Sequence, residues 1–314
     1  MTTINSPQEK AEMLKSAAVR GRSLWDDARA RLFRNRAAVV SMIVLGVLVV
    51  LALVGTVPMW SAEIFGEQVS LWPHAHDTIY RDRVSIPPTF ENWHIFGTDA
   101  QGRDLLARTL VGLGVSLMVG IVATIVSLVI GVTWGATAGF VGGRVDQLMM
   151  RFVDILYSLP FIFFVIILMV VFGRNIVLIF VAIGAVEWLT MARIVRGQTI
   201  ALRKMEFVEA AEAAGVSRWM IIRRHIIPNV LGPVVVYVTL LIPVVVLAES
   251  FLSFLGLGVQ EPLTSLGRLI AAGAQDMEVA PWTLIVPAVT MMITLFCLNF
   301  IGDGLRDAID PKDR

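Results

Sequence analysis

The chain alternates long apolar runs with short polar segments. Five runs contain no charged side chain, and a sixth is interrupted only by Glu187. A bilayer core about 30 Å thick needs roughly 20 apolar residues in a helix. The pattern therefore predicts six membrane-spanning helices, and only part of the second run, 115–138, is needed to cross. The six runs are 37–57, 109–143, 155–173, 175–192, 226–248 and 279–302.

Composition supports an all-α integral membrane protein. Hydrophobic residues make up 56% of the 314 residues and charged residues only 16%, whereas about a quarter of a soluble domain is charged. Apolar runs this long satisfy their backbone hydrogen bonds as helices rather than as barrel strands. The first run follows 36 mostly polar residues and is longer than a secretory signal core, so we expect it to be retained.

The distribution of basic residues predicts the orientation. Six spans place both termini on one side of the membrane. Twenty of the 26 Lys and Arg residues fall on that side, in 1–36, 141–154, 193–225 and 303–314. The positive-inside rule then places these segments in the cytoplasm. The expected organisation is a cytoplasmic segment 1–36, a first span 37–57, an outer periplasmic loop 58–108, a five-helix core 109–302 that includes the cytoplasmic loop 193–225, and a cytoplasmic tail 303–314.

Two flanking segments carry local signals. Trp25, Ala28 and Leu32 share one face of a predicted helix surrounded by arginines, which indicates an amphipathic helix on the inner membrane surface; a plain linker helix is the alternative. The outer loop contains His74, His76 and His94. These could hold a metal, but no further ligand pattern accompanies them, so we expect ordinary loop histidines.

Polar and small residues within the spans suggest two roles. Glu187 is the deepest acidic residue, because Glu249 and Asp303 fall at predicted span ends. A carboxylate in a span is costly and indicates either a wet pathway or a structural hydrogen bond. A doubled G-x-x-x-G pattern lets another helix approach closely, within the subunit or from a partner. The candidate residues are Glu187 for pathway lining and Gly131, Gly135 and Gly139 for helix packing.

The cytoplasmic loop predicts a helix–turn–helix. Residues 207–214 read F-V-E-A-A-E-A-A, an Ala-rich run of high helix propensity. Gly215 then supplies a left-handed helix end, and Ser217 can cap a second helix. Small side chains on the first helix would let it enter a groove on another protein. An ordinary surface hairpin is the alternative.

This loop resembles the EAA loop of permease subunits in bacterial ABC importers. Glu209-Ala210-Ala211 is followed by Gly215 and by His225-Ile226-Ile227-Pro228. The generic loop carries Ile and Leu where this chain has His225 and Ile227, and the variant here is similar to the peptide-importer branch. Segments 22–25, 97–104, 138–146, 192–198, 250–258 and 302–311 resemble that branch too, and above all its oligopeptide C-subunit members.

The resemblance implies a type I ABC importer permease fold and a heteromeric complex. The expected partners are a homologous second permease subunit, two ATPase subunits, an extracytoplasmic peptide-binding protein, membrane lipid and a peptide substrate. ATP and Mg would belong to the ATPase partners, with no cofactor or metal in this chain. The loop residues carried over are Glu209 for a polar contact to the ATPase, Ala210 and Ala211 for a close fit, and Gly215 for the turn.

Other functional classes are less well supported. The chain has no G-x-x-x-x-G-K-[ST] phosphate loop, no H-E-x-x-H and no G-x-S-x-G, so we expect no enzyme activity. The net charge of +1 argues against nucleic-acid binding, and the lone Cys297 precludes a disulfide within the chain. A proton-coupled carrier would show several acidic residues deep in its spans, whereas this chain has at most one, Glu187. Dipeptides, cell-wall peptides and nickel chelates remain alternative cargoes.

Overall fold

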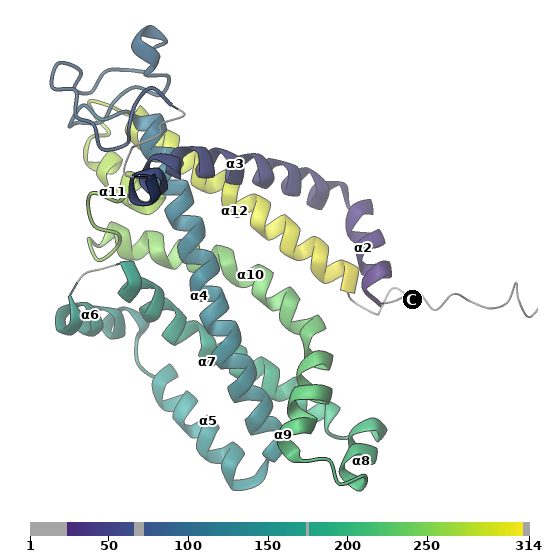
Figure 1. Ribbon diagram of the computed structural model, residues 1–314. Helices are drawn as coiled ribbons and strands as arrows, with labels where there is room; N and C mark the ends of the chain where they lie inside the picture. Colours follow the sequence, from purple (N-terminus) through teal and green to yellow (C-terminus); the bar gives the residue numbers. More distant parts are fainter. Residues whose placement is uncertain (1–23, 66–71, 174–175, 310–314) are drawn as a thin grey trace, which may run out of the picture.

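The computed structural model describes residues 24–65, 72–173 and 176–309, and the regular structure within these ranges is helical (Figure 1). The elements are α2 Leu24–Arg34, α3 Arg36–Phe65, η1 Glu91–Trp93, α4 Leu105–Val141, α5 Gly143–Tyr157, α6 Phe161–Phe172, α7 Ile176–Leu202, α8 Glu206–Ala213, α9 Arg218–Ile221, η2 Ile222–Ile226, α10 Ile227–Phe254, α11 Leu266–Gln275 and α12 Trp282–Ile309. Residues 1–23 of the expected cytoplasmic segment and 310–314 of the tail lie outside the described residues.

Five helical stretches are individually long and apolar enough to cross a membrane. They are Arg36–Val57, Leu105–Val141, Val177–Leu202, Arg218–Phe254 and Trp282–Ile309. Each corresponds to a predicted span and most extend beyond it, because helices continue through the interface into polar sequence. The second runs for 37 residues, which at 1.5 Å per residue is about 55 Å.

The third predicted span, 155–173, is wrong as a single straight helix. The chain instead forms α5 and α6, which are bent by 84°. The break is at Pro160, whose backbone is extended (φ −61°, ψ 125°) just before α6. Proline lacks an N–H and disfavours helical backbone in the preceding residue. A sixth crossing therefore requires the bent pair together, since the 12 residues of α6 reach only about 18 Å.

α4 is the central column, and α7 packs along it through a face without side chains. A Cβ on Gly131 would lie 2.5 Å from the Met191 Cβ, and one on Gly139 would lie 2.8 Å from the Arg196 carbonyl oxygen. A Cβ on Gly135 would overlap the Ala192 carbonyl oxygen. The structure thus places all three glycines against α7 of the same chain, and leaves no room there for a partner helix.

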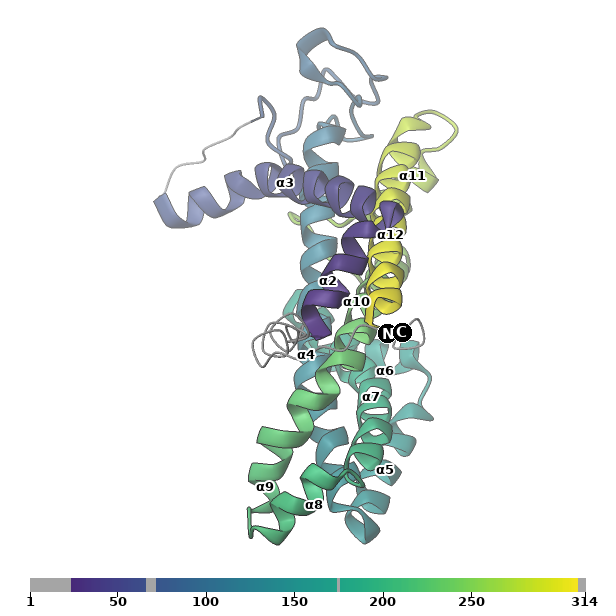
Figure 2. The ribbon, with the colours of Figure 1, turned by 90° about the vertical axis from the view of Figure 1, so that its right-hand side faces the viewer.

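The ends of the fold are separated along α4. The outer loop 72–104 lies at one end of α4, and α8 and α9 lie at the other (Figure 1). α2 lies beside the end of α12 (Figure 2); Ala28 is buried, and a Cβ on Gly304 would be 3.3 Å from Leu32 Cδ1. The apolar face of α2, expected to rest on the membrane surface, contacts α12.

α11 is a helix that the hydropathy pattern does not predict. Ser265 precedes it and accepts a hydrogen bond from the Arg268 N–H (3.2 Å). Leu266 and Leu269 are buried, and α11 packs against α10, α12 and α4. Because α11 is only ten residues long, it falls below the length at which a span is recognised from sequence.

Candidate functional site

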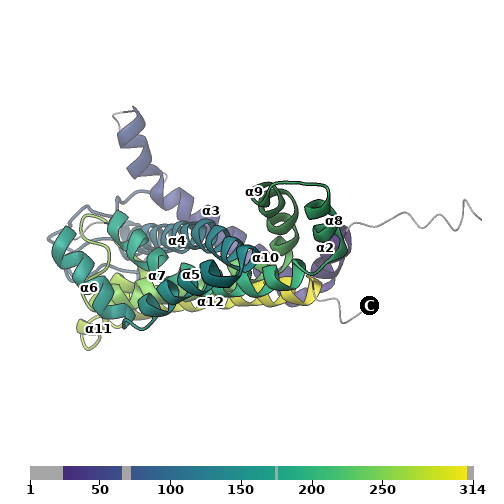
Figure 3. The same ribbon diagram turned by 90° about the horizontal axis from the view of Figure 1, so that it is seen from below.

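The loop predicted to be cytoplasmic forms the expected helical hairpin of α8 and α9 (Figure 3). Gly215 lies between them with φ +77°, in the left-handed region. Val216 N–H donates to the Ala211 carbonyl (3.1 Å), which satisfies the end of α8. Ser217 accepts from the Met220 N–H (3.4 Å) and begins α9. The turn chemistry is readable from the sequence, because it depends on one glycine and one cap.

The two faces of α8 have different environments. Val208 is fully buried and Ala211 is 9% exposed, in a cluster that includes Ile221 of α9 and Ile222 of η2. Glu209 and Ala210 are exposed, as is Ala213 at the end of α8. The outward face of α8 also carries Glu206, Glu212 and Phe207, so it combines small side chains with three carboxylates and one aromatic ring. Ala211 packs against its own chain, and its close fit to a partner stays a prediction.

The hairpin is joined to the membrane by an uninterrupted helical path. α9 passes into the π-helical turn η2, and η2 passes directly into α10. Ile221, Ile222 and Ile226 are buried along this path. No loop therefore separates α9 from α10.

Glu187 lies on α7 and faces α10. Its side chain is partly buried and lies within electrostatic range of the Tyr237 hydroxyl of α10. Tyr157 at the end of α5 lies within range of the same hydroxyl. Polar groups from three helices therefore lie in one region of the fold, which sequence spacing alone does not reveal.

We expect a cysteine at position 187 to react with a water-soluble thiol reagent in at least one state of the transport cycle. The reason is that an ionisable residue within a span normally faces water or an ionic partner, and no ion pair is found for Glu187 among the described residues. The measurement is labelling of Glu187→Cys in a chain carrying Cys297→Ala, with and without ATP. Protection in every state would leave Glu187 a structural residue.

Glu249 has a larger structural role than its place near a span end predicts. The side chain is 0% exposed. Ser116 Oγ of α4 donates to Oε2 (3.1 Å), and Ser253 Oγ donates to Oε1 (2.6 Å). Ser116 in turn accepts from the Leu266 N–H at the start of α11 (3.1 Å). Glu249 therefore ties α4, α10 and α11 together; the serines, dispersed in the sequence, gave no signal of it.

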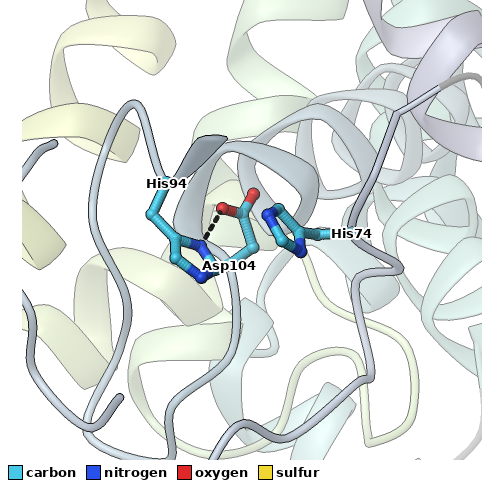
Figure 4. Close-up of side chains that lie close together, drawn as sticks. All are labelled: His74, His94 and Asp104. Carbon is cyan, nitrogen blue, oxygen red and sulfur yellow. Dashed lines mark hydrogen bonds and ion pairs between the residues drawn. The ribbon is translucent and has the colours of Figure 1, made fainter. Parts of the chain in front are cut away.

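The outer loop contains a buried cluster of His74, His94 and Asp104 (Figure 4). Asp104 Oδ2 accepts from His94 Nδ1 (2.8 Å), and Oδ1 accepts from the Ala107 N–H, so Asp104 also caps α4. His74 hydrogen-bonds with the Tyr80 hydroxyl (2.9 Å) and the Asn92 carbonyl (2.7 Å). These bonds use both nitrogens of His74 and account for the cluster as a polar core of the loop.

The third predicted histidine, His76, is not part of this cluster. The His76 side chain is partly buried, and this burial lowers the pKa of its imidazole. Asp104 was missed as a partner of the histidines because it lies ten residues beyond His94 in a different element. The group thus fixes the loop to the first turn of α4, and none of its members touches the hairpin or Glu187.

Comparisons with known proteins identify the family. The model for "binding-protein-dependent transport system inner membrane component" matches residues 131–314, and that for the "N-terminal TM domain of oligopeptide transport permease C" matches residues 23–88. The oligopeptide transport system permease protein OppC of Haemophilus influenzae is 53% identical and that of Escherichia coli K12 is 55% identical. The alignments cover 98% of this chain and 94% of the first relative, and 99% of this chain and 97% of the second.

A solved structure shows the same fold at low sequence identity. A chain of the MetNI methionine ABC transporter, in an inward-facing conformation, superposes with a TM-score of 0.52 and 21% identity, over 66% of this chain and 96% of that chain. The agreement concerns the helical core and carries no information on substrate. With the family model matching more than half of the sequence, the chain belongs to the binding-protein-dependent transport family of inner-membrane components.

Proposed function

We propose that this chain is the membrane-embedded permease subunit of an ATP-driven importer that moves oligopeptides across the cytoplasmic membrane. The observation that carries the proposal is the near full-length identity of 53–55% to relatives named as oligopeptide permease proteins. The exposed helical hairpin of α8 and α9, with Glu209 and Ala210 on its surface, supports it. The bent pair α5–α6 together with the five longer helices would supply six crossings, with both termini in the cytoplasm.

The proposed function requires partner proteins, and the exposed hairpin offers a contact surface for one of them. A homologous second permease subunit would complete the pathway, and an extracytoplasmic binding protein would deliver the peptide. Two ATPase subunits, which bind ATP and Mg, would contact this subunit through the hairpin. Glu209 and Ala210 are exposed and suit a polar contact and a close approach, respectively. Gly215 sets the turn, and Ala211 holds α8 against α9.

ATP binding would act by favouring one arrangement of the complex. A ligand shifts a conformational equilibrium only by its differential affinity for the two states. Closure of the ATPase pair would displace the hairpins of both permease subunits. The continuous path from α9 into α10 carries that displacement into the membrane, and so biases inward- against outward-facing states.

We expect ATP-dependent uptake of a labelled oligopeptide only when all components are present. The measurement is uptake into proteoliposomes that contain the second permease subunit and both ATPases, with binding protein added outside. Omission of either the ATPases or the binding protein should abolish uptake. Uptake by this chain alone, driven by a proton gradient, would overturn the proposal in favour of a secondary carrier.

A further inference from the structure

α5 exposes a row of apolar side chains, and its charged side chains Asp146, Arg151 and Asp154 lie on the other side of the helix, where only Asp146 is largely buried. Val145, Leu148, Phe152 and Ile155 are 45–73% exposed and follow one another at helical spacing. A helix surrounded by water shows the reverse arrangement. The outward face of α5 therefore matches lipid or an apolar partner surface, and ionisable residues on the opposite side of a membrane helix face a wet cavity or one another.

The polar side of α5 meets α7 through two ion pairs. Arg196 is bidentate to Asp146, with Nε–Oδ1 2.5 Å and Nη2–Oδ2 2.6 Å. Arg193 Nη2 donates to Asp154 Oδ1 (2.8 Å), and its guanidinium lies 4.2 Å from the centre of the Tyr157 ring. The second pair is much more exposed than the first, with 61% of the Asp154 side chain accessible against 13% for Asp146. The Arg193 pair is thus the more readily exchanged.

A third guanidinium on this face has no ion-pair partner in the described part of the chain. Arg151 is exposed and lines an open cleft of about 600 Å³, which we call the inner cleft; its lining is Gln147, Met150, Arg151, Asp154, Arg193 and Arg196. Because Arg196 is paired with Asp146 and Arg193 with Asp154, Arg151 leaves the inner cleft with an excess of one positive charge. Guanidinium forks bind carboxylates bidentately.

Polar groups continue from the inner cleft deeper into the fold. Tyr157 contacts the Arg193 guanidinium through its ring, and the hydroxyl of Tyr237 lies within electrostatic range of both Tyr157 and Glu187. Glu187 precedes Arg193 by six residues, about 9 Å along α7. A lipid headgroup would need only the basic residues at the interface. Polar side chains that continue beyond the cleft, at Tyr157, Tyr237 and Glu187, favour a solute that passes further into the fold.

We propose that the inner cleft is an anion-binding station on the peptide route, where Arg151 and Arg193 receive the C-terminal carboxylate of the transported peptide. This inference rests on the proposed function and assigns a substrate group to residues outside the hairpin. Asp154 acts as the resident carboxylate of Arg193 when no peptide is present. The arriving carboxylate replaces it, and Arg151 supplies the unpaired charge that makes the cleft attractive to anions.

The first test measures the charge preference of the cleft. Met150→Cys is introduced together with Cys297→Ala, and the complete complex is placed in nanodiscs of neutral lipid. We expect an anionic sulfonate thiol reagent to react faster than a cationic trimethylammonium reagent, by roughly fivefold, which is the ratio that one ordinary surface ion pair supports. Arg151→Gln should remove most of this ratio. Arg144→Gln, which deletes the same charge from the same helix outside the cleft, should keep it.

The second test identifies the occupant. A peptide with a free C-terminal carboxylate should slow labelling of Met150→Cys, and its C-terminal amide, bound equally by the delivery protein, should not. Phe152→Cys on the apolar face should stay unreactive. Protection by anionic lipid without peptide would assign the cleft to a headgroup, and equal rates for both reagents would show no anion preference; either outcome overturns the inference. Peptide uptake by the wild-type complex is measured in parallel. If only the inference about the cleft is wrong, wild-type uptake persists; if the proposed function is wrong, wild-type uptake is absent.

Discussion

Replacing Gly215 with Val should uncouple ATP hydrolysis from peptide uptake while leaving the chain inserted in the membrane. Gly215 has φ +77° and open space around it, so the substitution meets no clash and acts only on the backbone. Left-handed backbone costs an L-residue about 1–2 kcal/mol, and more when the side chain is β-branched. The turn should relax to another conformation and re-aim α8 relative to α9. The measurement is uptake per ATP hydrolysed in the reconstituted complex.

A matched pair of variants isolates the backbone effect. Gly215→Asn should retain most coupling, because asparagine tolerates left-handed backbone. Gly197→Val offers a second control, since Gly197 is exposed on α7, has no positive φ, and would have nothing within 4 Å of an added Cβ. Normal coupling in Gly215→Val would show that the hairpin turn does not orient the ATPase contact.

Replacing Gly135 with Leu should destabilise the isolated chain more than any change at the surface. A side chain there would meet the Ala192 carbonyl and would approach the Val195 Cβ to 2.9 Å and the Arg196 N to 3.0 Å. Two of these atoms belong to backbone and cannot turn aside. Overpacking of this kind costs about 1–3 kcal/mol, and α4 and α7 must separate along their contact. The measurement is the melting temperature of the purified chain in detergent.

The control for this variant lies on α3. A Cβ added to Gly46 would have no neighbour within 4 Å, so Gly46→Leu should leave the melting temperature unchanged. If the glycine face of α4 instead receives a partner helix, Gly135→Leu would leave the isolated chain as stable as wild type. It would then lower only the yield of assembled complex, which co-purification measures.

Sequence reasoning predicts those parts of the fold that are determined by residues close together in the chain. The apolar runs mark five spanning helices because lipid imposes length and composition on each of them separately. Gly215 and Ser217 mark the hairpin because a turn and a cap need particular residues. The same reasoning failed at Pro160, where an apolar run was given more weight than the break that proline imposes on a helix.

The parts that were missed depend on contacts between distant segments. Glu249 was placed near an interface by its position in the run, yet it is enclosed by serines that lie far apart along the chain. Asp104 joins the outer histidines only when the loop folds back onto α4. Ala211 was grouped with Ala210 because the two are neighbours in sequence, although they lie on different faces of α8. Burial and side-chain direction at these positions follow from tertiary packing.

The helical stretch from Arg218 to Phe254 would give the hairpin a lever arm in the proposed importer. Its 37 residues would reach about 55 Å if they were straight, but the π-helical turn Ile222–Ile226 and the internal prolines Pro233 and Pro243 bend it (Figure 1), so its reach is shorter. Glu249 ties the far end to α4 and α11. A rotation of about 5° around that tie would move the hairpin by at most about 5 Å, so a small angular change at one end of the stretch would correspond to a displacement of several ångströms at the other.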